Sequence, residues 1–184
     1  SSQATKTKSI SDVSIAGSLQ SVHARVLLVD DNATNRKVAS QILMKAGCEV
    51  EMASSGQGAI SILQSDANFD LVLMDIQMPE MDGIEATEII RKELHLKTPI
   101  IALTANAFKT EIDRCRKAGM DDYITKPFTD SELINAIRAR LEKVKIQQNQ
   151  GGKAIETWYQ IVSDLGNKDE MHKRLESHDI IEYK

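Results

Sequence analysis

The sequence predicts an α/β fold, a doubly wound, five-stranded parallel sheet with helices on both faces. Five short apolar runs alternate with five segments of helical periodicity along residues 25–146, the order that parallel strands joined by crossover helices require. The strongest runs, residues 26–29 and 71–74, are apolar at every position. A continuous run of this kind is typical of a strand covered on both faces.

The first part of this domain contains two predicted strands. Residues 26–29 form the first, and Val38 and Ile42 recur at helical spacing in the helix that follows. Gly47 is placed to end that helix. Residues 49–53 are less apolar and predict a weaker strand, nearer an edge of the sheet.

The middle of the domain repeats the alternation. Residues 59–63 carry the apolar positions of a second helix, and residues 69–74 form the third strand. Residues 84–93 predict a third helix, and residues 99–103 predict a fourth strand that ends at Thr104. The alternation therefore continues without a break.

The last strand and helix have a clear boundary between them. A polar helix ends at Gly119 and is followed by a strand at residues 121–125. Thr129 and Glu132 have the spacing of a capping box, which predicts the start of a helix there. The apolar face of that helix consists of Leu133, Ile134, Ile137, Leu141 and Val144. We expect a polar linker at residues 147–152 and a short amphipathic helix at residues 154–165.

Length and composition indicate one domain with flanking segments. The 184 residues are 41% hydrophobic and 27% charged, with a net charge of -4. The boundaries we predict are a flexible arm or linker at 1–23, the domain at 24–147 and a tail at 148–184. Cys48 and Cys115 have no CxxC partner, so we expect buried, reduced thiols.

Several partner classes are not expected. No basic stripe with interleaved aromatic residues is present, so we predict no nucleic-acid partner. The longest apolar runs have four or five residues, which predicts no membrane span and no membrane contact by this fragment. Residues 1–20 lack the apolar centre of a signal peptide. These features predict a cytoplasmic location, which is compatible with a membrane-anchored parent protein.

Polar residues with reactive groups stand at the carboxyl ends of the strong strands. These are Asp30 and Asp31, Asp75, Thr104 and Lys126. Because the carboxyl ends of parallel strands lie along one edge of a sheet, the five residues can meet in one pocket. Three carboxylates in one place repel one another, and oxygen-only ligands favour Mg²⁺ as the cation that relieves the repulsion.

This combination is suited to phosphoryl transfer. A carboxylate can act as a nucleophile and form an aspartyl phosphate. Asp75 is our candidate nucleophile, the Lys126 ammonium would hold developing charge, and the Thr104 hydroxyl would donate to a phosphoryl oxygen.

The residues around these positions resemble the receiver domain of two-component signalling. The motifs are Val-Asp-Asp-Asn (29–32), Leu-Met-Asp-Ile-Gln-Met-Pro-Glu-Met-Asp-Gly (73–83), Ala-Leu-Thr-Ala-Asn-Ala (102–107) and Ile-Thr-Lys-Pro-Phe (124–128). The resemblance covers about residues 25–146, and all four motifs occur in order at the family's spacing. It implies the flavodoxin-like strand order 2-1-3-4-5.

The resemblance also implies a role for each site residue. Asp75 would be the phosphoacceptor, and Asp31 and Asp75 would bind Mg²⁺ with the backbone carbonyl of Gln77, while Asp30 acts largely through bound water. Thr104 and Tyr123 match the family's switch pair. Lys126 precedes Pro127 at a position where the family uses a cis peptide bond.

The residues in these motifs resemble most the corresponding residues of receivers attached to hybrid histidine kinases. This implies that the phosphoryl group comes from a phosphohistidine of a kinase domain and passes to a histidine-containing phosphotransfer protein. The fragment would assist its own phosphorylation and dephosphorylation, and the parent chain would be a protein histidine kinase. Gln77 and Asn106 would lie at the pocket mouth and tune the lifetime of the aspartyl phosphate.

Four other readings stay open on sequence alone. One is a stand-alone response regulator that acts by protein contact. Another is a Mg²⁺-dependent phosphatase of the haloacid dehalogenase type, whose nucleophile lies on the first strand in an Asp-x-Asp pattern; here that strand ends Asp-Asp-Asn (30–32). The third is an interaction module without phosphorylation, which would normally lack an acid or the lysine. The last is a purely structural ion-pair cluster.

Overall fold

The computed structural model describes residues 21–164, with side chains up to residue 153, and its contacts divide the chain into two units after Ile137. The elements are β1 (Arg25–Val29), α1 (Ala33–Lys45), β2 (Glu49–Ala53), α2 (Gly56–Ser65), β3 (Leu71–Asp75), α3 (Gly83–Lys92), β4 (Ile100–Thr104), α4 (Lys109–Ala118), β5 (Asp122–Thr125) and α5 (Asp130–Asp164). Strands and helices alternate throughout, as the sequence predicts.

The five strands form one parallel sheet in the order β2-β1-β3-β4-β5. This confirms the predicted class and the order 2-1-3-4-5. The polar strand β2 lies at an edge, also as predicted, whereas β1 and β3 lie inside the sheet. All five residues of β3 are buried, which explains why its sequence shows no alternation.

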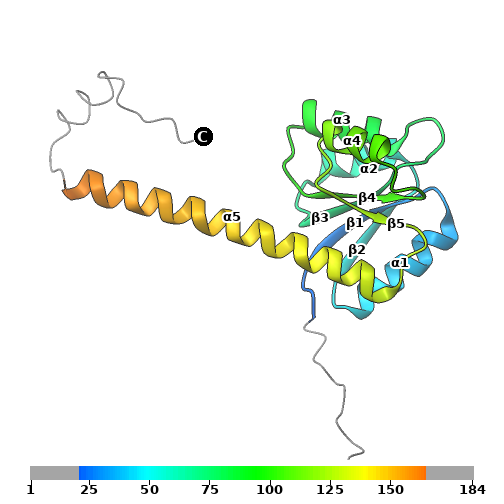
Figure 1. The fold of residues 1–184 in the computed structure, drawn as a ribbon, viewed down its shortest axis with the longest axis horizontal. Helices are drawn as coiled ribbons and strands as arrows, with labels where there is room; N and C mark the ends of the chain where they lie inside the picture. Colours follow the sequence, from blue (N-terminus) through cyan, green and yellow to red (C-terminus); the bar gives the residue numbers. More distant parts are fainter. Residues whose placement is uncertain (1–20, 165–184) are drawn as a thin grey trace, which may run out of the picture. The chain divides into compact units, whose positions relative to one another are not determined.

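Helices cover both faces of the sheet (Figure 1). Helices α2, α3 and α4 lie on one face, and α1 lies on the other with the first turns of α5. Side chains of successive strand residues point to opposite faces. Leu27 and Val29 accordingly belong to the core cluster beneath α2, α3 and α4, while Leu28 is fully buried without belonging to it. The helix residues Leu133 and Ile137 are fully buried too.

Side-chain caps fix where the helices begin. The carboxylate of Asp82 accepts a hydrogen bond from the Glu85 amide at 2.8 Å at the start of α3. At the start of α5, the Glu132 amide donates to the Thr129 hydroxyl at 3.2 Å and the Glu132 carboxylate accepts from the Thr129 amide at 2.7 Å. The predicted capping box is therefore confirmed.

The predicted linker at residues 147–152 is wrong. Helix α5 runs without interruption from Asp130 to Asp164 and includes these residues and most of the separate helix expected at 154–165. Gly151 and Gly152 each cost a helix about 1 kcal/mol relative to alanine. Neither glycine removes a backbone donor as proline would, and no proline follows Pro127. The glycines therefore weaken the helix without ending it.

The exposure of Val38 differs from the prediction. Val38, placed with the apolar positions of α1, is 51% exposed, and the buried residues of that helix include Ile42 and Leu43. Residues 1–20 of the predicted arm at 1–23 lie outside the described residues. Within the described part, Val22 is buried and its amide donates to the Ala46 carbonyl at 2.7 Å.

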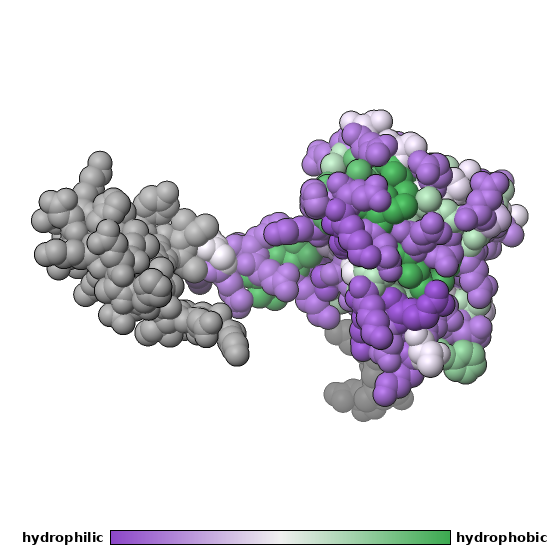
Figure 2. Space-filling model, turned by 90° about the horizontal axis from the view of Figure 1, so that it is seen from above, coloured by the Kyte–Doolittle hydropathy of each residue, from purple (hydrophilic) through white to green (hydrophobic). Residues whose placement is uncertain are grey.

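Three further features concern the cysteines, the character of the helices and the hydropathy of the surface. Cys48 and Cys115 are buried free thiols, as predicted. None of the helices in residues 21–164 combines the length and apolar character needed to cross a membrane. Figure 2 shows one face of the molecule, on which hydrophilic residues predominate and hydrophobic residues form small, separate patches.

Candidate functional site

Three acidic residues meet at the carboxyl edge of the sheet. Asp30 and Asp31 follow β1, and Asp75 is the last residue of β3. One carboxylate oxygen from each can be chosen so that all lie within 4.8 Å of one another. Asp30 and Asp75 are only 2% and 3% exposed, whereas Asp31 is exposed. The predicted cluster of carboxylates is present.

Lys126 brings a positive charge to this cluster from the end of β5. Its Nζ lies 2.9 Å from Oδ1 of Asp75 and 3.4 Å from Oδ2 of Asp30. The Lys126–Pro127 peptide bond is cis, as the resemblance implied. One ammonium faces three carboxylates, so the pocket keeps an excess of negative charge.

Burial and the neighbouring charges both shift the pKa values of Asp75 and Lys126. Burial raises the pKa of the Asp75 carboxyl and outweighs the ion pair with Lys126, which lowers it; the Asp30 charge adds to the rise. Burial lowers the pKa of the Lys126 ammonium, but the contacts with Asp75 and Asp30 bring it above its ordinary value. The raised pKa of Lys126 shows that the acids favour a positive charge at this position, whereas the raised pKa of Asp75 mainly reflects its burial.

The β1–α1 loop holds Asp30 through several contacts. The Asp30 carboxylate accepts hydrogen bonds from the Asn32 amide at 2.9 Å and from Nδ2 of Asn35 at 3.3 Å. Asn32 in turn caps α1 by accepting from the amides of Thr34 and Asn35. Sequence reasoning did not identify Asn35. Its position, one helical turn after the acidic pair, was the available signal.

Arg36 is a second residue that sequence reasoning missed. Its Nη1 donates to the main-chain carbonyls of Asp30 at 2.6 Å and of Asp31 at 3.0 Å. A basic residue in the first turn of a helix is ordinarily a surface residue, so the sequence contains no distinct signal for this contact.

The β3–α3 loop bends sharply behind Asp75. The Gly83 amide donates to the Ile76 carbonyl at 2.9 Å, and a Cβ on Gly83 would lie 2.1 Å from the Asp75 carbonyl oxygen. Glycine is therefore required here for a close approach of two main-chain segments. The Gln77 amide hydrogen-bonds to the Asp75 carboxylate and lowers its pKa, although burial keeps that pKa raised overall.

Thr104 is buried at the carboxyl end of β4, yet its hydroxyl is engaged on the α4 side. Oγ1 lies 2.8 Å from the Asn106 carbonyl and 2.9 Å from Oε1 of Glu111, and it accepts from the Asn106 amide at 3.1 Å. The predicted hydrogen bond from Thr104 to a phosphoryl oxygen stays a prediction, and among the described residues the hydroxyl has these partners instead. Glu111 was not identified from the sequence.

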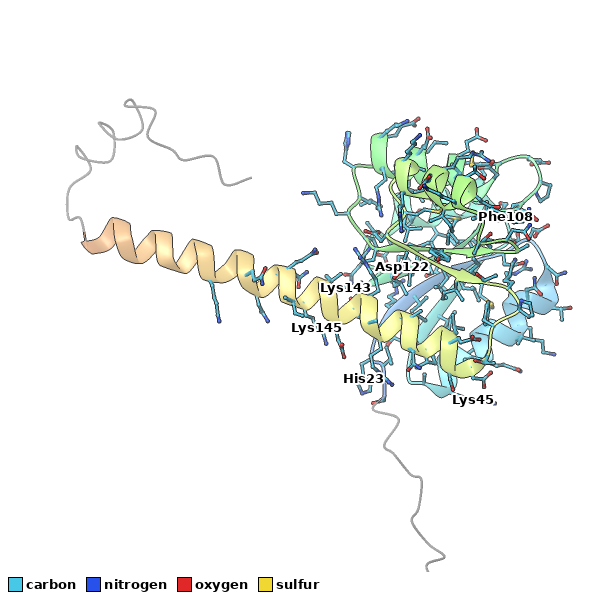
Figure 3. The ribbon with its side chains drawn as sticks, viewed as in Figure 1. His23, Lys45, Phe108, Asp122, Lys143 and Lys145 are labelled. Atoms are coloured by element: carbon cyan, nitrogen blue, oxygen red, sulfur yellow. The ribbon has the colours of Figure 1, made fainter. Side chains whose placement is uncertain are left out.

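Tyr123 is 39% exposed on β5 and lines a small hollow together with α4 residues that include Ile112 and Cys115. Phe108, which precedes α4 and is labelled in Figure 3, is 68% exposed. Its side chain makes no capping hydrogen bond.

The donor set at the cluster suits a hard divalent cation. Three carboxylates gather with no histidine or thiol among them, which favours Mg²⁺ over zinc. The excess negative charge, after Lys126 is counted, is of the right sign for such an ion.

A family model for the response regulator receiver domain matches residues 26–138 of the chain. Among curated proteins, "Probable histidine kinase 4" of Oryza sativa subsp. japonica is 42% identical over 134 residues, which are 61% of this chain and 13% of that protein. The "Sensor protein GacS" of Pseudomonas syringae pv. syringae is 43% identical over 123 residues, or 65% of this chain and 14% of the relative. The chain thus spans about one seventh of these relatives.

Solved structures show the same fold. The chemotaxis protein CheY4 of Vibrio cholerae aligns with a TM-score of 0.61 at 33% identity, covering 64% of this chain and 98% of that one. The signal receiver domain of a signal transduction histidine kinase from Syntrophus aciditrophicus aligns with a TM-score of 0.60 at 32% identity, covering 66% and 92%.

Proposed function

The chain belongs to the response regulator receiver family, and from that premise we propose that Asp75 accepts a phosphoryl group from a phosphohistidine. The observation that carries this role is the position of Asp75 at the end of β3, 2.9 Å from Lys126 and beside Asp30 and Asp31. A carboxylate in this position is buried, and its charge is stabilised by the Lys126 ammonium. It also lies next to two further acids that can bind a second cation.

The proposed step is an in-line displacement at phosphorus. An oxygen of the Asp75 carboxylate forms a bond to phosphorus while the N–P bond of the phosphohistidine breaks. The bonding electron pair leaves with the imidazole nitrogen. Lys126 has its ammonium within hydrogen-bond distance of Asp75, so it can hold charge on the transferred group.

Asp30, Asp31, Asp75 and the backbone carbonyl of Gln77 would hold Mg²⁺, with Asp30 acting largely through water. When bound, the ion would neutralise charge on the phosphoryl oxygens. Support comes from the oxygen-only donor set within 4.8 Å. Because Asp31 is the exposed member of the cluster, it is the carboxylate best placed to meet an ion from solvent.

Thr104 and Tyr123 would respond to phosphorylation as a switch pair. For Thr104 to donate to a phosphoryl oxygen, its hydroxyl must leave Asn106 and Glu111. Tyr123 would then turn inward from its half-exposed position. Gln77 and Asn106, two residues beyond Asp75 and Thr104, would tune the lifetime of the aspartyl phosphate.

Receivers of two-component systems work with histidine kinases and phosphotransfer proteins, and we propose both for this chain. The kinase domain of a hybrid sensor histidine kinase would be the donor, and a histidine-containing phosphotransfer protein the acceptor. The identity of 42% and 43% to receiver regions of histidine kinase and sensor proteins supports this origin over a stand-alone regulator.

A phosphotransfer assay tests the proposal. Radiolabelled phosphohistidine on a kinase core is mixed with this chain in Mg²⁺, and a purified phosphotransfer protein is then added. We expect label on the chain, none on Asp75→Asn, and onward transfer to the phosphotransfer protein.

Asp82→Asn is the matched control, because asparagine retains the helix cap of α3 and the variant changes an acid outside the cluster. Label on Asp75→Asn at the normal rate would refute the assignment. Label on the wild type without onward transfer would favour the stand-alone regulator, and release of phosphate from small phosphate esters would favour a phosphatase.

A further inference from the structure

Arg36 connects the first turn of α1 with the main chain of the acidic pair. Its Nη1 donates to the carbonyl oxygens of Asp30 and Asp31, at 2.6 Å and 3.0 Å. Both residues lie beyond β1, whose pairing with β3 ends at Val29 and Met74. Their carbonyls lie past the pairing with β3, and among the described hydrogen bonds the Arg36 guanidinium is the donor that they meet.

The two acids differ in how their side chains are held. The Asp30 carboxylate accepts hydrogen bonds from Asn32, Asn35 and Lys126. Among the described residues, no donor contacts the Asp31 carboxylate, which is exposed. The direction of the Asp31 side chain therefore depends on the position of its main chain. Arg36 donates a hydrogen bond to the carbonyl of that main chain.

We propose that Arg36 is a positioning residue for the cation site, holding Asp31 in the direction that metal binding needs. This inference rests on the proposed function, because it concerns the same site. Arg36 touches neither the ion nor the phosphoryl group in this role. It acts through the peptide groups of two ligand residues, as outer partners of metal ligands commonly do.

The positive charge of Arg36 allows a positioning effect on Mg²⁺ affinity to be distinguished from a purely electrostatic one. A guanidinium close to a cation site repels the cation, so its removal by charge alone would tighten Mg²⁺ binding. Loss of positioning has the opposite sign. The direction of the change in Mg²⁺ affinity therefore decides between the two effects.

The experiment is a calorimetric titration of the whole chain with Mg²⁺, without any phosphodonor. We expect Arg36→Met to bind about tenfold more weakly than the wild type, the lower range for loss of an outer partner. Arg36→Lys should recover part of the affinity, because an ammonium can still donate to one carbonyl. Lys37→Met is the matched control: it removes an exposed charge from the next residue, and we expect equal or slightly tighter binding.

The titration is made at a temperature at which circular dichroism shows each metal-free variant to be folded, so a loss of stability alone does not change the result. If Arg36→Met does not fold, Arg36→Lys carries the test, with weaker binding than the wild type expected. Unchanged or tighter binding in the variant tested would overturn the inference. Wild-type binding that is absent, or that survives Asp31→Asn unchanged, would instead count against the metal site of the proposed function.

Discussion

The hydroxyl of Thr104, at the end of β4, lies 2.9 Å from Oε1 of Glu111 in the first turn of α4. The same hydroxyl has the Asn106 carbonyl as an alternative acceptor at 2.8 Å. A hydroxyl has one proton, so it donates to only one of them at a time. The start of α4 is thus tied to the residue that would contact a phosphoryl group.

This contact predicts that Glu111→Ala speeds phosphorylation. A hydrogen bond to a charged group contributes about 1.5–3 kcal/mol, and part of this would oppose turning the hydroxyl toward the pocket. We expect up to about tenfold faster labelling by a small phosphodonor such as acetyl phosphate. Asp113→Ala removes an acid from the same helix without a described contact to Thr104 and should react at the wild-type rate. A slower Glu111→Ala would show that the bond supports the reactive arrangement.

We expect a loss of stability when a side chain is added at Gly83, because its Cβ would meet atoms of Asp75 and Met74. In Gly83→Ala the new Cβ would meet the Asp75 carbonyl oxygen at 2.1 Å, so the main chain must shift. We expect a loss of about 2 kcal/mol in the free energy of unfolding by urea, together with slower phosphorylation. Gly151→Ala is the matched control, since nothing lies within 4 Å of its added Cβ in α5. That variant should gain helix content by circular dichroism.

Asp75 predicts a pH dependence of stability. Burial raises its pKa in the folded state, so the folded protein binds more protons than the unfolded chain between the ordinary carboxyl pKa and the raised one. The free energy of unfolding therefore falls as pH rises through this window. Asp75→Asn should remove that fall and be more stable than the wild type at neutral pH. Urea unfolding of both proteins across the acidic range measures the difference, and parallel curves would contradict burial of Asp75 as the cause.

We expect the removal of the Lys126 charge to have opposite effects on Mg²⁺ affinity and on the rate of phosphorylation. Lys126→Met removes the charge 2.9 Å from Asp75, so Mg²⁺ should bind at least about tenfold more tightly. Labelling from phosphohistidine should nevertheless be slower, because the cation for the transferred group is lost. Calorimetry and the transfer assay give the two readouts on one sample. Weaker Mg²⁺ binding would mean that Lys126 organises the acids rather than competing with the ion.

Much of the site was predictable because it depends on strand ends. Asp30 follows the buried strand β1, Asp75 ends the buried strand β3 and Lys126 follows the edge strand β5. Parallel strands bring their carboxyl ends together whatever the details of packing. The start of α5 was predictable for a similar reason. A capping box is a local pattern, and its two hydrogen bonds between Thr129 and Glu132 form within four residues.

Other features depended on contacts that no local pattern records. The sequence around residues 147–152 resembles a linker, yet α5 continues through it. Val38 has the spacing of a buried residue but faces solvent, because α1 buries a neighbouring stripe that contains Ile42 and Leu43. Helical spacing alone does not state which of several adjacent apolar stripes meets the sheet.

The sequence by itself determined the alternation of strands and helices, the parallel sheet and the identity of the acids and the lysine at its edge. These follow from hydrophobic periodicity and chain connectivity, which are properties of neighbouring residues. Only the tertiary structure decided two sets of hydrogen bonds. Arg36 donates to the carbonyls of Asp30 and Asp31, and the Glu111 carboxylate accepts from the Thr104 hydroxyl. Such contacts depend on side-chain rotamers and on loop paths, and these are set only when the helices are packed on the sheet.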